Sequence, residues 1–99
     1  MLPTVYFVER SVGLARRVVA AYLDKEQAEL HVKTLMDEVT KCRRWEEEGS
    51  GTGWVEDWQD PWQYQCPYDP QFDYSPGLIY VMSQMPLVRH IDEWMEEVS

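Results

Sequence analysis

Residues 24–48 carry a regular apolar stripe, and this stripe constrains the fold more than any other feature of the sequence. Apolar side chains recur there at steps of four and three residues, as on one face of an α-helix: Ala28, Val32, Leu35, Val39 and Cys42. Asp24 with Gln27 three residues later forms a capping box before the stripe. Gly49 can end the helix. The sequence therefore predicts one long helix against which the rest of the chain packs.

Two strand patterns precede this helix. Thr4–Glu9 is a run of β-branched and aromatic residues, with Val5 and Phe7 on one face. Arg16–Leu23 is interpreted as a second strand, although residues 14–23, LARRVVAAYL, could also be drawn as a helix. The short connection between the two runs favours an antiparallel hairpin.

Two further elements follow near the C-terminus. Leu78–Met85 alternates in the manner of a strand and is closed by Pro86. Val88–Val98 has apolar residues at helical spacing and predicts a short helix.

The predicted order is strand, strand, helix, insertion, strand and short helix. We therefore expect an α+β fold of two layers, in which a three-stranded antiparallel sheet packs on the long helix. The chain is expected to form a single domain over residues 1–99. It divides into a hairpin plus long helix (1–48), an aromatic acidic insertion (49–77), and a third strand plus terminal helix (78–99).

Charge is distributed unevenly along the chain, whose net charge is −9. Residues 1–44 hold eight Lys and Arg against six Asp and Glu, whereas residues 45–99 hold one base, Arg89, against twelve acids. Such a surface repels phosphate backbones, so direct nucleic-acid binding is not expected. It would attract a basic partner. The alternative is that the acids serve solubility alone.

The insertion is rich in both rings and acids. Residues 51–74 include three Trp, three Tyr, one Phe and five acids, with no Lys or Arg. Asp60-Pro61 is a good start for a helical turn. Disordered segments are poor in aromatics, so we expect this one to be at least partly ordered. Its rings could cover the open sheet face, with Trp54, Trp58 and Phe72 in the core. They could instead form a binding surface, because Trp and Tyr are enriched in interface hot spots.

Three stretches resemble a pattern in small uncharacterised phage and bacterial proteins: VYFV at 5–8, VVAAYLDKEQAE at 18–29 and IYVMSQMPL at 79–87. In these β-β-α-β proteins a hairpin ends in a turn of the form Y-x-x-x-E-x-A-E, a helix follows, and the last strand ends in P-L. The resemblance implies a phage-like or mobile-element origin. It implies no activity and supplies no catalytic residue.

The sequence contains little that is typical of a catalytic or metal-binding site. His31 and His90 are expected to be surface or boundary residues, and no spacing supports a nucleophile pair of Cys66 with His90. The glycines of GSGTG at 49–53 are followed by no lysine, which argues against phosphate binding. A divalent cation could gather the carboxylates of Glu46–Glu48, Glu56 and Asp57, but a solvated charge run is the commoner arrangement. No enzyme and no cofactor is predicted.

The N-terminus lacks the pattern of a signal peptide, and no apolar stretch is long enough to span a bilayer. We therefore expect a cytoplasmic protein, in the host cytoplasm if a phage encodes it, without a membrane partner. Cys42 and Cys66 are expected to be free thiols in that compartment.

The leading hypothesis is a non-enzymatic interaction protein that binds a basic surface of a host protein or complex. Its concrete form is an inhibitor of a nucleic-acid-dependent defence system, such as an anti-CRISPR protein that imitates nucleic acid. The expected partner-binding residues are Glu46, Glu47, Glu48, Trp54, Glu56, Asp57, Trp58, Asp60, Trp62, Tyr64 and Tyr68. The first alternative is a self-associating assembly module, a homodimer through an exposed sheet edge or the Trp94 helix. The second alternative is a small enzyme or metal protein.

Overall fold

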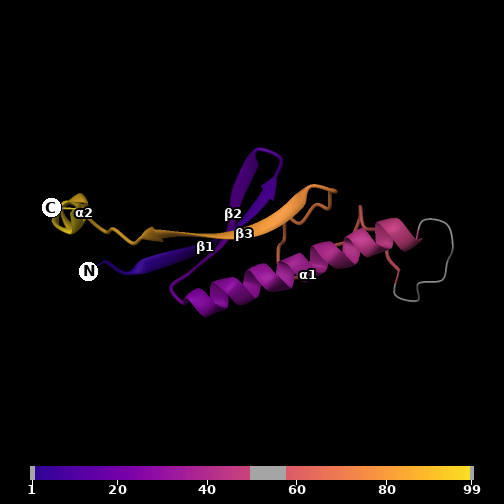
Figure 1. The fold of residues 1–99 in the computed structure, drawn as a ribbon, viewed down its shortest axis with the longest axis horizontal. Helices are drawn as coiled ribbons and strands as arrows, with labels where there is room; N and C mark the ends of the chain where they lie inside the picture. Colours follow the sequence, from indigo (N-terminus) through magenta and orange to yellow (C-terminus); the bar gives the residue numbers. More distant parts are fainter. Residues whose placement is uncertain (1, 50–57, 99) are drawn as a thin grey trace.

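The computed structural model describes residues 2–49 and 58–98 and contains five regular elements (Figure 1). The strands are β1 (Thr4–Val12), β2 (Ala15–Tyr22) and β3 (Leu78–Pro86), and the helices are α1 (Lys25–Gly49) and α2 (Ile91–Val98). The predicted α+β fold and its element order are confirmed.

The three strands form one antiparallel sheet in the order β2-β1-β3. The third strand therefore joins the first, with Val8 opposite Met82. On the other side of β1, Tyr6 lies opposite Tyr22, and a bulge shifts the register between Val8 and Glu9. Gly13, with a φ of 58°, opens the two-residue turn between β1 and β2.

The sheet and α1 bury a common core. Val8 of β1 and Leu78 and Tyr80 of β3 lie on the sheet face that meets the helix. The predicted helical stripe supplies the opposing side of this core, with Ala28, Leu35, Val39 and Cys42 buried and Val32 partly buried. Alternate residues of the strands and the stripe of the helix therefore face each other across the core, as two packed layers require.

Segment 58–77 packs beside α1 on the same face of the sheet. Cys66 and Tyr74 belong to the core cluster that contains the α1 stripe, and Tyr64 and Phe72 pack against it. The expectation that the rings cover the opposite face of the sheet is therefore wrong for the described residues. The helix crosses the sheet obliquely in Figure 1, and the segment is linked to it at His31, Glu38 and Glu46.

The opposite face of the sheet, which we call the open face, meets no other described helix or strand. Residues that alternate with the core positions lie on it, including Phe7 and Val81 as half-buried side chains and Val18 and Ile79 as exposed ones. A sheet with one apolar face uncovered is a surface that can take part in an interface.

The molecule is elongated, with principal extents of 62 × 25 × 17 Å. The outer ends of β1 and β3 project beyond the body as a two-stranded ribbon, and α2 follows at the tip near the N-terminus (Figure 1). Within the described residues, α2 packs on no other helix or strand. None of the described helices is both long enough and apolar enough to cross a lipid bilayer.

Each of the five elements differs from its predicted bounds by one to three residues at one or both ends. β1 extends to Val12 because it pairs with β3 along its whole length. Within residues 14–23, which could also be drawn as a helix, Ala15–Tyr22 forms a strand because β1 supplies its backbone partners. α2 begins at Ile91 rather than Val88, because the Leu87 amide donates to the Pro3 carbonyl and holds the chain extended.

Candidate protein interaction surface

A buried carboxylate fastens segment 58–77 to the sheet. Asp69 is 3% exposed, and its carboxylate accepts hydrogen bonds from the Tyr80 hydroxyl at 2.7 Å and the Arg10 guanidinium at 3.2 Å. It also accepts from the backbone amide of Gln71 at 2.9 Å. Arg10 donates in addition to the Gln71 carbonyl. A buried charge is tolerated only with such partners, so Asp69 is explained as a structural anchor.

A second anchor joins the segment to the middle of α1. The Tyr64 hydroxyl donates to Glu38 at 2.6 Å and accepts from the Lys41 ammonium at 2.9 Å. Lys41 and Glu38 also form an ion pair at 2.8 Å. Partial burial opposes the charge on Lys41, but these two oxygen partners outweigh it and raise the pKa of Lys41 above its ordinary range. The predicted contact residue Tyr64 is therefore half-buried and engaged within the chain.

A third anchor lies near the C-terminal end of α1. The buried Tyr74 donates its hydroxyl proton to Glu46 at 2.6 Å. Burial, and then the hydrogen bond and charge of Glu46, raise the pKa of Tyr74 to about 12, against the opposing effect of Arg43. Tyr74 thus stays a hydrogen-bond donor at physiological pH, and the charge of Glu46 is held next to it.

His31 forms a fourth link, near the start of α1. Its Nε2 lies 2.9 Å from the Tyr68 carbonyl oxygen, and its Nδ1 lies 2.9 Å from the Tyr22 hydroxyl. A carbonyl oxygen only accepts, so Nε2 carries the proton, and in the neutral ring Nδ1 accepts from Tyr22. This arrangement gives His31 a structural role between β2 and the segment.

Two tryptophans face outward at the C-terminal end of α1. Trp58 is 40% exposed although its indole N–H donates to the Trp45 carbonyl at 2.8 Å. Trp62 is 53% exposed and stands edge-on against the Tyr74 ring, with 5.2 Å between ring centroids. Asp60 accepts from the Trp62 amide and so fixes the turn that was predicted at Asp60-Pro61. Both indoles are held in place while part of each ring remains open to solvent.

We call the set Glu46, Glu47, Trp58, Asp60 and Trp62 the tryptophan surface. Glu47 is exposed and Asp60 half-buried. The last turn of α1 contains no basic residue, so its carboxylates add to the partial negative charge of the helix terminus. The surface therefore combines aromatic faces with negative potential.

One acid of the second half is neutralised within the fold, because Arg10 pairs with Asp69. Lys41 of the first half donates to the neutral Tyr64 hydroxyl and pairs with Glu38. Asp69 is therefore not available to a partner.

Apart from Tyr64, the predicted contact residues separate into three groups. Trp54, Glu56 and Asp57 lie outside the described residues. Trp58 and Trp62 are tied to the end of α1, through the Trp45 carbonyl and through the Tyr74 ring that binds Glu46, and Asp60 caps the turn between them. Glu47 and Glu48 are exposed on the last turn of α1. Tyr68 is exposed in a different place, where its carbonyl meets His31.

Sequence reasoning missed the residues that position this surface. Trp45 is buried, with its ring edge-on to Tyr64 at a centroid distance of 5.2 Å. It extends the apolar stripe by one further step of three from Cys42, which was the available signal. No pattern in the sequence indicates that Asp69 is buried, because its partners come from strands that are distant along the chain.

The described residues offer little for nucleophilic or metal chemistry. Burial raises the pKa of the Cys42 thiol to about 11 and also raises the pKa of Cys66, which disfavours their thiolates. Among residues 2–49 and 58–98, no group of three or more His, Cys, Asp or Glu side chains is placed to hold a metal ion. The predicted carboxylate set includes Glu56 and Asp57, which fall outside this range.

The chain was compared with protein-family models, with curated proteins and with solved structures, and no match was found in any of them.

Proposed function

We propose that this protein is a non-enzymatic interaction module that binds a cationic protein surface through the tryptophan surface. The observation that carries the proposal is the position of Trp58 and Trp62. Each indole is anchored by its own contact, yet 40% and 53% of these residues stay exposed beside carboxylates. Large rings that are fixed in place lose little conformational entropy on binding, which is typical of interface anchors.

The chemistry of this surface suits arginine or lysine side chains. A guanidinium can stack on an indole face and pair with a neighbouring carboxylate at the same time. The fold already contains a related arrangement, because the Lys41 ammonium lies 5.3 Å from the centroid of the Trp45 ring and 2.8 Å from Glu38. The net charge of −9 would speed encounter with a basic partner.

An arginine-rich peptide provides a direct probe of the site. Its binding to the full chain can be followed by the anisotropy of a fluorophore on the peptide. Trp62→Ala, and separately the pair Glu47→Lys with Asp60→Asn, should each raise the dissociation constant about tenfold through lost cation–π and ionic contacts.

Control variants separate a local site from net charge. Asp37 and Glu29 are exposed acids on α1 outside the tryptophan surface, and Asp37→Lys with Glu29→Gln changes the net charge by the same amount. If this pair weakens binding as much as Glu47→Lys with Asp60→Asn, the attraction is general and the proposal fails. Unchanged affinity of Trp62→Ala would contradict it too. Circular dichroism confirms that each variant is folded.

The inhibitor of a nucleic-acid-dependent host system, the concrete form of this function, stays a proposal about the partner. Capture from host lysate with wild-type protein and with Trp62→Ala, followed by mass spectrometry, tests it. A nucleic-acid-binding protein enriched only by the wild type would support this form.

A further inference from the structure

β3 is an edge strand with a free stretch of backbone. In antiparallel pairs, alternate residues turn their N–H and C=O groups away from the neighbouring strand. On β3 these outward groups belong to Leu78, Tyr80, Met82 and Gln84. The Leu78 amide donates to the Ser75 carbonyl at 3.1 Å, and the Tyr80 amide donates to the Met36 sulfur at 3.1 Å. The amides of Met82 and Gln84 have no hydrogen-bond partner within residues 2–49 and 58–98.

The two edges of the sheet differ in their protection against strand pairing. β2, at one edge, carries Arg16 and Arg17 and contains the bulge, whose extra residue is Val19, and both features discourage a further strand. β3, at the other edge, is nine residues long and has no charged side chain. An unprotected edge is a template for another strand.

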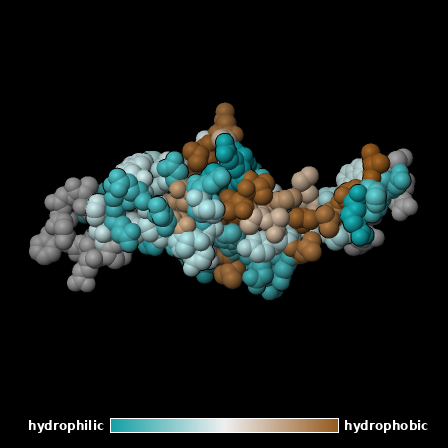
Figure 2. Space-filling model, turned by 180° about the vertical axis from the view of Figure 1, so that it is seen from behind, coloured by the Kyte–Doolittle hydropathy of each residue, from teal (hydrophilic) through white to brown (hydrophobic). Residues whose placement is uncertain are grey.

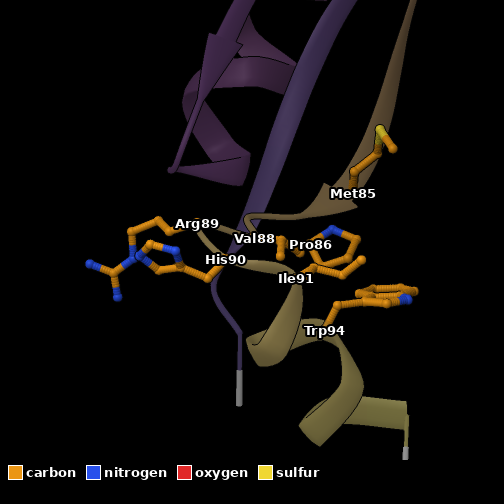
Figure 3. A pocket seen from close by; sticks show the side chains of 7 residues that line it. All are labelled: Met85, Pro86, Val88, Arg89, His90, Ile91 and Trp94. Atoms are coloured by element: carbon orange, nitrogen blue, oxygen red, sulfur yellow. The ribbon is translucent and has the colours of Figure 1, made fainter.

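The chain that follows β3 adds an apolar surface that no other described helix or strand covers. Met85, Pro86, Ile91 and Trp94 gather on one side of this arm, whereas Arg89 and His90 point to the other side (Figure 3). Both sets, together with Val88, line an open groove of about 400 Å³. Ile91 is 74% and Met85 59% exposed. Figure 2 shows hydrophobic residues spread along this end of the molecule and into its middle.

We propose that two copies of this chain pair their β3 strands antiparallel about a two-fold axis and form a six-stranded sheet. The free amides fix the register. Met82 of one copy lies opposite Gln84 of the second copy, Ser83 lies on the axis, and four backbone hydrogen bonds form. The ladder ends there, because Pro86 has no N–H and the Tyr80 amide is already bound to Met36.

This register brings together side chains that a single copy leaves uncovered. On the open face Met85 lies opposite Val81 of the second copy, and Leu87 lies opposite its Ile79. Directly opposed residues in antiparallel strands contact one another on the same face. Met85, Leu87 and Ile79 are all exposed in one copy, so the pairing removes apolar surface from water.

The same pairing places the α2 end of each copy beside the hairpin turn of the other copy. α2 follows the C-terminal end of β3, and the turn at Gly13 and Leu14 lies at the opposite end, since Val12 pairs with Leu78. The arm of each copy therefore lies beside the hairpin turn of the other, within about 5–10 Å by the spacing of strands. Leu14 is fully exposed there and is of a size to enter the groove.

Charges at these ends are also complementary. α2 begins with Asp92 and Glu93, while Arg16 and Arg17 follow the hairpin turn and are exposed. Arg16 and Arg17 lie on β2, about 14 Å (three strand spacings) from the β3 of the second copy, so these charges favour the approach of the two copies and form no ion pair between them. In this two-fold pair, each copy covers the free edge and the groove of the other. These features therefore favour a second copy of the chain as the partner. This inference uses residues outside the tryptophan surface and does not depend on the proposed function.

Sedimentation velocity over micromolar concentrations tests the dimer. The wild type should sediment as a dimer that dissociates on dilution. Gln84→Pro removes an outward N–H and so two of the four hydrogen bonds, which should raise the dissociation constant about tenfold or more. Ala21→Pro is the matched control, because Ala21 lies opposite Phe7 and its N–H points outward on β2. A wild type that is monomeric throughout, or equal effects of the two prolines, would overturn the proposal.

A cross-link tests the register itself. Ser83 meets Ser83 of the second copy in a pair without mutual hydrogen bonds, where Cα atoms are about 4.5 Å apart, within the range of a disulfide. Ser83→Cys should therefore form a covalent dimer under mild oxidation. Ala21→Cys, on the open face of β2, should form far less, and the native cysteines are buried. Equal cross-linking of the two variants would contradict the proposed register.

Discussion

The Tyr80 hydroxyl donates a 2.7 Å hydrogen bond to the carboxylate of Asp69. This contact joins β3 to segment 58–77 inside the core, and Arg10 from β1 completes the charge pair at 3.2 Å. A segment rich in acids and prolines is thereby held on the sheet through one of its own carboxylates. This site is one of four anchors that hold the segment carrying Trp58 and Trp62.

Replacement of Asp69 should be among the most destabilising changes in the segment. Asp69→Ala leaves the Arg10 charge and the Tyr80 hydroxyl without their acceptor, so the free energy of unfolding should fall by about 3 kcal/mol. Urea denaturation followed by circular dichroism measures the loss. Asp73→Asn, at an exposed acid of the same segment, is the control and should change the stability by less than about 0.5 kcal/mol. Equal effects would show that Asp69 is no anchor.

The coupling between Tyr80 and Asp69 can be isolated in a double-mutant cycle. Tyr80→Phe alone should cost about 2 kcal/mol, as for a hydrogen bond to a charged acceptor. In the Asp69→Ala background the same change should cost clearly less, because the acceptor is already gone. Additive losses would contradict a direct contribution of this hydrogen bond to stability.

Stability should decrease at alkaline pH. The pKa of Cys42 is raised from 9.0 to about 11 and that of Tyr74 from 10.0 to about 12, in both cases first by burial. Above pH 9 the unfolded state therefore releases protons that the folded state keeps, so the free energy of unfolding falls as pH rises. Below about pH 8 both groups are protonated in either state and contribute no slope. Denaturation at a series of pH values should show the decline, and Tyr74→Phe should reduce it between pH 10 and 12. An unchanged slope in this variant would assign the decline to other groups.

The hairpin turn should depend on glycine at position 13. Gly13 has a φ of 58°, in the left-handed region that other L-residues avoid. A Cβ at Gly13 or Gly77 would meet no atom within 4 Å, and only Gly13 has a positive φ. Gly13→Ala should therefore cost about 1 kcal/mol or more through backbone strain alone. Gly77→Ala should be near neutral, and thermal melts of the two variants compare them. A loss in Gly77→Ala as large as in Gly13→Ala would refute this explanation.

Trp45 should tolerate loss of its N–H better than loss of its volume. The ring is buried against Tyr64, but its Nε1 has no hydrogen-bond partner among the described residues. Trp45→Phe keeps much of the apolar packing and removes an unsatisfied donor, so it should cost far less than Trp45→Ala, for which about 3–5 kcal/mol is expected. Chemical denaturation of both variants provides the comparison, and similar losses would contradict it.

Local patterns predicted the elements of this fold well. The stripe from Ala28 to Cys42 predicted α1 and its buried face, because helical periodicity is a property of neighbouring residues. Alternation in the strands predicted which side chains share a face, as Leu78 and Tyr80 do. The sequence does not decide whether β3 pairs with β1 or with β2, since strand order depends on contacts between residues far apart in the chain.

The sequence by itself determined the elements, the capping residues, the hairpin and the concentration of rings and acids in one insertion. Only the tertiary structure decided that this insertion packs beside α1, that Asp69 is buried, that Trp58 and Trp62 are partly exposed, and that β3 has a free edge. The physical reason is the distance along the chain over which each kind of interaction acts. Periodicity and turn chemistry act between neighbours, whereas burial and charge pairing depend on which distant segments meet, as Arg10 and Asp69 do.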